Sequence, residues 1–285
     1  MRWNEDHESP DVIDRRGESS SSSTGGGPGL GGLLAFVPFL FRSPFGWLVL
    51  LVVGAIVAFG FFRRTLVPTA KNRPASEDKM AHFVAFVLDD TQANWTREFT
   101  ARRRSYRRAK LVLFTDGTDT ACGYGRSATG PFYCPADERA YIDLGFYRDL
   151  EQRLGARGDF AKAYVIAHEI GHHVQKILGA NAKVPRSGAE GPSGASVRLE
   201  LQADCYAGVW AHSTAQRSIL EKGDIESALG AAAAIGDDRL QRRGGGRVRP
   251  ETFTHGTSEQ RVSWFQRGAS SGRLEDCDTF TAGSL

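Results

Sequence analysis

A run of eighteen uncharged, mostly apolar residues constrains this chain more than any other feature. Residues 45–62 read FGWLVLLVVGAIVAFGFF, with Arg42 before them and Arg63 and Arg64 directly after them. A helix rises 1.5 Å per residue, so a helical run of this length just crosses the apolar core of a bilayer. A secretory signal peptide would have a shorter apolar region nearer the N-terminus. The sequence therefore predicts one transmembrane helix, which we expect to anchor the chain as a single-pass protein of the cytoplasmic membrane.

The segments around this run differ in composition. Residues 1–32 are expected to form a charged tail that continues into a disordered Ser/Gly linker, because SSSSSTGGGPGLGG at 19–32 cannot bury a core. Residues 65–80 are expected to be a polar spacer, and residues 81–285 one folded domain. Basic residues flank the apolar run on both sides, so the positive-inside rule does not assign an orientation.

The charge of the chain argues against a nucleic-acid-binding protein. The net charge is +3 over 285 residues, which is small for a chain of this length. Basic residues do gather in RRRSYRRAK at 102–110. We interpret this run as a solvated face; the alternative is a patch for nucleic acid or anionic lipid, with Tyr106 as a stacking residue.

Hydrophobic spacing predicts an α+β domain in which helices dominate and the sheet is small. Strands are expected at residues 111–114 and, with a weaker pattern, at 141–144. Helices are expected at about 82–99, 146–155, 160–178, 196–212 and 224–235. Asp159 can cap the start of the 160–178 helix, and Gly179 can end it.

The helix at 160–178 carries the stretch AHEIGHHVQ, residues 167–175. Residues four apart lie on one face of a helix, so His168 and His172 can both reach one Zn²⁺ ion. Glu169 lies to the side of that pair, where it can reach a metal-bound water without being a ligand. This is the His-Glu-x-x-His arrangement of zinc hydrolases. Gln175 and Leu178 occupy the positions at which a metzincin has glycine and a third histidine, so that class is excluded.

A carboxylate is the remaining choice for a third ligand. SVRLELQADCYAGVWAH at 196–212 places Glu200 and Asp204 four residues apart on a second predicted helix. We predict Glu200 as the ligand and Asp204 as the acceptor for the free N–H of a ligand histidine, which fixes the ring. The reverse assignment of these two carboxylates stays open. Small residues at Gly171, Ala203, Ala207 and Gly208 are expected to let the two helices approach closely.

Two histidines and one carboxylate leave a fourth metal position open for water, which is the catalytic pattern. Zn²⁺ lowers the pKa of its bound water and polarises a carbonyl, and Glu169 would act as general base. His255, in THGTSEQR, is the best candidate donor to the developing oxyanion, and Tyr206 is a weaker one. We expect His173 to lie beside the site without binding metal, and His82 and His212 to take no part in it.

These motifs resemble the bacterial family of putative neutral zinc metallopeptidases, which are small membrane-anchored proteins. The resemblance runs nearly the length of the chain, through DRRG at 14–17, GPFYCP at 130–135, YIDLGF at 141–146, AYVIAHEIGHHVQ at 163–175, SVRLELQADCYAGVWA at 196–211 and THGTSEQR at 254–261. It implies a zincin-like metallopeptidase domain, with His168 and His172 as ligands of zinc and Glu169 as catalytic base. A peptide or protein is then the substrate; the resemblance does not say which.

The four cysteines indicate the compartment. Cys122 and Cys134 flank a Gly-rich loop, while Cys205 lies on the Glu200 helix and Cys277 near the C-terminus. These spacings fit no zinc ribbon, so we expect disulfides 122–134 and 205–277. Disulfides require an oxidising compartment, so we expect the domain to lie outside the cytoplasmic membrane; the alternative is four buried free thiols and a cytoplasmic domain.

Two functions follow from these predictions. The first is a membrane-anchored zinc endopeptidase. The alternative is a non-catalytic membrane-anchored binding protein that keeps zinc as a structural element, against which Glu169 argues because a structural site does not need that carboxylate. The sequence does not indicate an oligomeric state.

Overall fold

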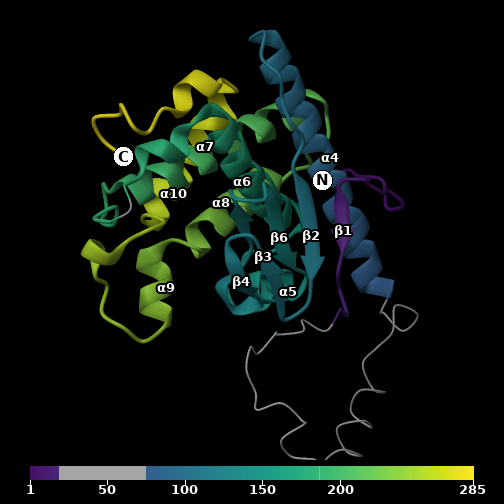
Figure 1. Cartoon of the computed structure of the whole chain (residues 1–285), viewed down its shortest axis with the longest axis horizontal. Coiled ribbons are helices and arrows are strands. Elements are labelled where there is room, and N and C mark those ends of the chain that lie inside the picture. The colour runs from purple at the N-terminus through teal and green to yellow at the C-terminus, as the bar shows by residue number, and fades with distance from the viewer. Residues whose placement is uncertain (19–74, 186) are drawn as a thin grey trace, which may run out of the picture. The chain divides into compact units, whose positions relative to one another are not determined.

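The computed structural model of the chain describes residues 1–18, 75–185 and 187–285. Helices dominate this part of the chain, and two small sheets accompany them (Figure 1). The prediction of a helix-dominated α+β fold is therefore confirmed.

The predicted helices and strands are present with shifted boundaries. The longer helices are α4 (Ala75–Ala101), α6 (Asp159–Leu178), α7 (Ala195–Gln216), α8 (Asp224–Ala234) and α10 (Ser258–Ser271), and the shorter ones are α5 (Gly145–Gln152) and α9 (Asp237–Arg243). The strands are β1 (Val12–Asp14), β2 (Lys110–Phe114), β3 (Gly117–Thr120), β4 (Gly123–Arg126), β5 (Phe132–Cys134) and β6 (Arg139–Asp143). The sequence analysis missed α9, α10, β1, β3, β4 and β5. All four missed strands have three or four residues, too few to show an alternating pattern.

The main sheet has four strands in the order β1-β2-β6-β5. Strands β1, β2 and β6 are parallel, and β5 runs antiparallel to β6 at one edge. Side chains alternate between the two faces, so Leu111 and Leu113 join the main core while Val112 and Phe114 face the other way. The β3–β4 hairpin lies over that second face, where a Cβ on Gly125 would meet the ring of Phe132 at 2.4 Å.

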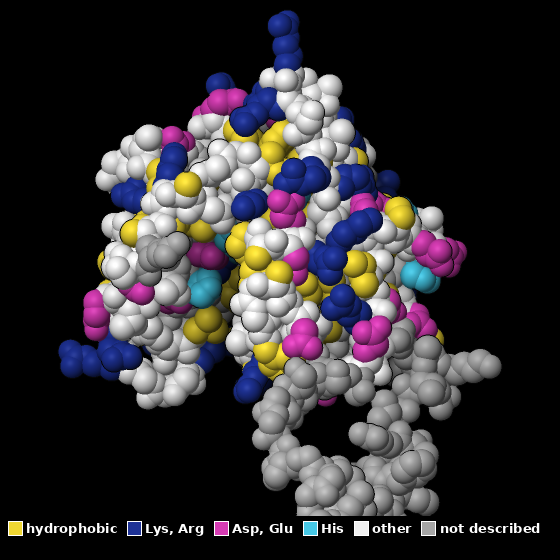
Figure 2. All heavy atoms as spheres, in the orientation of Figure 1, with side chains coloured by type: hydrophobic (Ala, Val, Ile, Leu, Met, Phe, Trp, Pro, Cys, Tyr) yellow, Lys and Arg dark blue, Asp and Glu magenta, His cyan; other side chains and the backbone are white. Residues whose placement is uncertain are grey.

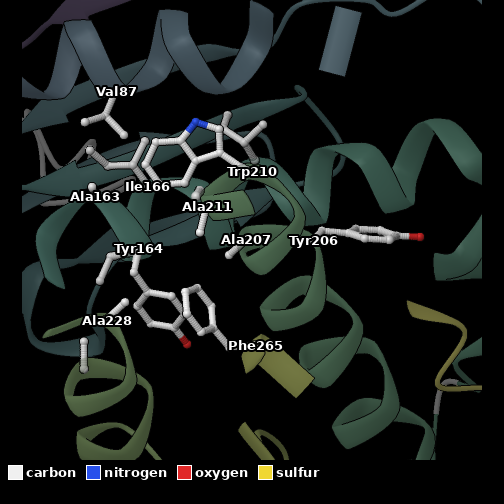
Figure 3. Close-up of a cluster of buried hydrophobic side chains, with 14 of the residues drawn as sticks. Val87, Ala163, Tyr164, Ile166, Tyr206, Ala207, Trp210, Ala211, Ala228 and Phe265 are labelled. Carbon is white, nitrogen blue, oxygen red and sulfur yellow. The ribbon is translucent and has the colours of Figure 1, made fainter. Parts of the chain in front are cut away.

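Helix α6 lies at the centre of the fold. It contacts α4, α7, α8, β5 and β6, and α10 packs against α7 and α8. The apolar side chains shared by these helices meet in one cluster, in which Tyr164 meets Phe265 edge-on (Figure 3). In the same cluster the ring of Phe160 stacks on Trp210. This packing holds the helix that carries the predicted metal ligands.

Glycines determine where α6 ends and how closely α7 approaches it. Gly179 ends α6 in the left-handed conformation, as predicted, with φ of 81°. The start differs from the prediction, because Gly158 is the N-cap residue and Asp159 is already the first helical residue. A Cβ on Gly171 would lie 3.0 Å from the carbonyl oxygen of Ala203, so α6 and α7 pack with little space between their backbones. Gly208 serves a different contact, since a Cβ there would meet the backbone of α10.

The N-terminal residues differ from the expected tail. Residues 1–16 belong to the same compact unit as residues 75–285, and β1 pairs with β2 as an edge strand of the main sheet. A strand of three residues has no pattern of its own and forms here because β2 offers it a partner. Helix α4 also begins at Ala75, inside the predicted spacer, since residues 75–80 already belong to it.

The membrane prediction falls on residues that the structure does not describe. Residues 45–62, the Ser/Gly linker and most of the spacer lie outside the described ranges. Among the helices that are described, none combines the length and the apolar character that a membrane span needs.

Both predicted disulfides are present. Cys122 is bonded to Cys134 and Cys205 to Cys277, so the second disulfide joins α7 to the C-terminal segment. The first ties the β3–β4 hairpin to β5.

Part of the basic run at 102–110 is paired within the fold. Arg102 binds Glu98 and Glu275, Arg107 binds Glu138, and Lys110 binds Asp11. The face drawn in Figure 2 accordingly intersperses basic and acidic side chains. Tyr106 is partly buried and packs edge-on against the rings of Phe99 and His173, so both of these rings already contact it.

Candidate metal centre

Three predicted ligands from two helices converge at one point. His168 and His172 project from α6, one helical turn apart, and Glu200 projects from α7. Each offers one ligand atom, and these atoms all lie within 4.8 Å of one another. Glu200 Oε2 lies 3.2 Å from His168 Nε2, and Glu200 Oε1 lies 3.4 Å from His172 Nε2. The carboxylate therefore bridges the two ring nitrogens that face each other across the site.

The other ring nitrogen of each histidine has its own partner. His168 Nδ1 lies 2.8 Å from Asp204 Oδ1, which is the role that the sequence predicted for Asp204. His172 Nδ1 lies 2.8 Å from Gln175 Oε1. Gln175 is in turn fixed, because its amide donates to the carbonyl of Leu199 on α7 at 2.6 Å. The sequence analysis missed this partner, although a spacing of three residues on one helix could have indicated it.

Asp204 lies in a fully buried ion pair that the sequence did not reveal. Arg261, from α10, donates from Nε to Asp204 Oδ2 at 2.8 Å and from Nη2 to Oδ1 at 2.9 Å. The Tyr164 hydroxyl donates to Asp204 Oδ1 as well. Burial alone would raise the pKa of Asp204, but the Arg261 charge outweighs it and lowers that pKa. Three helices thus hold an ionised carboxylate against the ring of His168.

This carboxylate changes the electrostatics of the ligand next to it. Burial would lower the pKa of His168, yet the Asp204 charge raises it to about 10. Burial would likewise raise the pKa of Glu200, but His172 and His168 lower it well below the usual range. The pocket therefore stabilises positive charge at the point where the three ligands meet.

Glu169 lies in the same cavity with one oxygen unused. Its side chain is buried, and its Oε2 atom has no hydrogen-bond partner among the described residues. Burial raises the pKa of Glu169, and the two neighbouring histidines partly oppose this effect. A buried carboxylate oxygen without a partner is costly, so an unpaired oxygen beside a cavity points to a ligand or a water that it contacts.

His255 also lines the cavity. It stands on the loop between α9 and α10, and its Nδ1 lies 3.2 Å from Asp237 Oδ1. Asp237 Oδ2 also accepts from the backbone N–H groups of Thr254, His255 and Gly256 at 2.8, 2.7 and 3.1 Å. The bond to Asp237 raises the pKa of His255, with burial opposing it. Asp237 is thus positioned to orient His255, the predicted oxyanion donor. The sequence analysis missed Asp237.

The other candidates lie elsewhere. His173 is buried, with Nε2 donating to the carbonyl of Arg107 at 2.6 Å and Nδ1 accepting from Tyr133 at 2.9 Å. His82 and His212 bond to the backbone carbonyls of Glu5 and Ala269. Tyr206 packs against Trp95 and points away from Tyr164 on the site side of the core, so the proposal of Tyr206 as an oxyanion donor is wrong (Figure 3).

A cavity of about 1170 Å³ opens onto these groups. Its lining comes from residues 127–133, from α5, α6 and α7, and from α9 and the loop that follows it. In Figure 2 the surface is hollowed between the part that carries α9 and the part that carries β4 and α5, with histidine and acidic side chains beside the hollow. The volume is larger than one side chain and suits an extended ligand.

The residues present fit a zinc ion. Two imidazoles and one carboxylate converge, both imidazoles have a partner on their far nitrogen, and an unpaired carboxylate oxygen lies beside them. Nitrogen and oxygen donors in this number, next to an open cavity, match a catalytic zinc site.

Comparison with known proteins agrees with this donor set. The family model described as "Putative neutral zinc metallopeptidase" matches residues 1–280. The chain is 46% identical over 295 residues to the Uncharacterized protein YpfJ of Escherichia coli K12, covering 98% of this chain and 99% of that protein. It is 47% identical over 191 residues to the Uncharacterized protein Rv2575 of Mycobacterium tuberculosis, covering 63% of this chain and 65% of that one. No solved structure matches the chain. The chain belongs to the putative neutral zinc metallopeptidase family.

Proposed function

We propose that this protein is a zinc-dependent endopeptidase, anchored to the membrane by the apolar residues 45–62. The observation that carries the proposal is the convergence of His168, His172 and Glu200 in one cavity with the unpaired oxygen of Glu169. The family supports a metal-dependent peptidase, and the ligand roles are our proposal.

Each residue has a chemical role in this proposal. His168, His172 and Glu200 would hold Zn²⁺, which supplies a Lewis acid for a peptide carbonyl and lowers the pKa of a water molecule toward ~7. Glu169 Oε2 would accept the proton of the attacking water and pass it to the leaving amine. His255 would donate to the oxyanion, and Asp237 and Asp204 would orient His255 and His168.

The arrangement also supports a zincin-like architecture. The motif helix α6 packs against β5 and β6 of the mixed sheet, and the third ligand comes from α7, the next long helix of the chain. An extracytoplasmic position of the domain is likewise proposed, because both pairs of cysteines are disulfide-bonded.

The test compares three proteins prepared in detergent as full-length chains. Bound zinc and the cleavage of an unfolded protein substrate are measured for the parent, Glu169→Gln and Glu200→Ala. We expect the parent to bind one zinc and to cleave, Glu169→Gln to keep zinc without cleaving, and Glu200→Ala to lose zinc. Equal zinc in all three without cleavage by any would favour a non-catalytic zinc-binding protein.

A further inference from the structure

The N-terminal segment, residues 1–16, is an integral part of the folded domain. Val12, Ile13 and Asp14 pair in parallel register with Leu111, Val112 and Leu113. Strand β2 is thereby paired on both sides, by β1 and by β6. Without β1, the backbone groups of β2 along that edge would lose their partners, and apolar side chains of the core would face water.

Ion pairs hold the middle of this segment against the rest of the domain. Asp11 is 5% exposed and accepts from the ammonium of Lys110 at 2.7 Å and from the guanidinium of Arg108 at 2.5 Å. Gln92, on α4, donates to the same carboxylate at 3.2 Å. Undocking the segment would separate this buried carboxylate from three donors of the domain, which costs free energy.

The beginning of the segment is fastened to α4 as well. The ring of Trp3 meets Phe83 edge-on, with ring centroids 5.1 Å apart, and the Lys79 ammonium lies 2.5 Å from the Glu5 carboxylate. The backbone N–H of Arg2 donates to the carbonyl of Ile219, beyond α7. The segment therefore contacts elements from both halves of the domain.

Its end lies beside the first turn of α4. Arg16 is 6% exposed, and its guanidinium donates to the Glu77 carbonyl at 2.9 Å and contacts Asp78 at 3.3 Å. The chain thus leaves the folded unit after Arg16 and re-enters it at Ala75 within one small region.

We infer that residues 1–16 lie on the same side of the bilayer as the metal site. A single crossing by residues 45–62 would put residues 1–44 and the domain on opposite sides, and β1 could not then pair with β2. The inference rests on the membrane attachment within the proposed function and not on peptidase activity. The partner it implies is the apolar core of a lipid bilayer.

The first test labels single cysteines with a membrane-impermeant maleimide in cells whose outer envelope has been opened. Glu8→Cys reports the N-terminal segment and Glu226→Cys, on α8, reports the domain, and both positions are exposed. The parent is the control, since all four of its cysteines are in disulfides. Membrane attachment is measured separately, by resistance to alkaline carbonate extraction.

We expect carbonate-resistant protein in which the two cysteines behave alike. If both cysteines are labelled before the cytoplasmic membrane is lysed, the inference is supported and the domain is extracytoplasmic. If both are protected until lysis, the inference is supported and the domain is cytoplasmic. Labelling of one with protection of the other overturns the inference. Release by carbonate overturns the membrane attachment on which it rests, and cleavage activity would be unaffected by that outcome.

The second test asks directly whether the segment is docked in the membrane-embedded protein. A carbodiimide activates a carboxylate, which an adjacent amine then attacks to form an amide while the urea leaves. Glu5 and Lys79 are exposed and in contact, so membranes treated this way should yield a peptide cross-linked between them. Lys79→Gln should abolish that cross-link. Absence of the cross-link from the parent, with Glu5 recovered as its N-acylurea and Lys79 unmodified, would show that the segment is not docked.

Discussion

The two sides of the candidate site are built differently. On the ligand side, Asp204 and Arg261 are almost fully inaccessible to solvent and connect α6, α7 and α10 behind His168. On the opposite side, His255 stands on a loop with its side chain 50% exposed and has Asp237 as its acidic partner. Asp204 and Arg261 are buried and hydrogen-bonded, as polar groups in a protein core are, whereas the His255 side is open to solvent and to a substrate. We therefore expect changes on the first side to affect metal binding and stability, and changes on the second to affect turnover.

Glu169 lies on α6, which carries two of the proposed ligands, but its proposed role is in turnover. Glu169→Gln is therefore expected to have the largest effect on cleavage. Glutamine keeps the shape but cannot accept a proton, so cleavage should fall by about 10²–10⁴-fold, the usual contribution of a general base. Bound zinc should stay at the parent level. Zinc content and initial rates on one preparation check this, and parallel loss of zinc would make Glu169 a ligand.

His255→Ala should reduce kcat by about 10²–10³-fold, as expected for the loss of one oxyanion donor. Zinc affinity should not change, because His255 lies outside the group of three ligand atoms. His212→Ala is the matched control, since His212 bonds only to groups remote from the cavity among the described contacts. A fall in zinc affinity equal to the fall in kcat would contradict the division between the two sides.

Asp204→Asn should act on the ligand side. Removing the charge that holds the His168 ring is expected to weaken zinc binding by about 10–100-fold. It also leaves Arg261 buried without its counter-ion, which should destabilise the fold by about 3–5 kcal/mol. Competition with a chelator and thermal unfolding measure the two effects. Asp278→Asn, a carboxylate near the C-terminus, should change neither, and a loss of kcat with unchanged zinc affinity in Asp204→Asn would refute the assignment.

The smallest expected effect is a shift in pH dependence. With Nδ1–H directed at Asp237, the Nε2 atom of His255 carries a proton only in the imidazolium form, so activity should fall as pH rises through the pKa of His255. Asp237 raises that pKa. Asp237→Asn should therefore move the alkaline limb of kcat to lower pH, toward the ordinary histidine value of about 6.5. An unchanged alkaline limb would assign it to another group.

The sequence predicted site residues that form local patterns along a helix, and it missed Arg261 and Asp237, whose partners lie far away along the chain. His168, Glu169 and His172 lie on one helix whose local pattern was clear, and Glu200 and Asp204 followed from a second helix of the same kind. Arg261 lies 57 residues from Asp204, and Asp237 lies 18 residues from His255. No local spacing joins such pairs, so only the packing of α10 and α9 reveals them.

The secondary structure was likewise predicted only where the sequence pattern is local. Helices with a long periodic pattern were predicted, while strands of three or four residues were missed because they form through pairing with a neighbour. Strand β1 is the most consequential of these, since its pairing with β2 places residues 1–16 in the folded unit and not in the expected N-terminal tail.

X-ray absorption at the zinc edge, on the full-length protein loaded with one equivalent of zinc, tests the central claim most directly. We predict two imidazole nitrogens at about 2.0–2.1 Å, oxygen in the remaining positions and no sulfur, with Glu200→Ala losing the ion or one oxygen ligand. Sulfur ligands, or a spectrum unchanged by Glu200→Ala, would contradict the proposed metal centre.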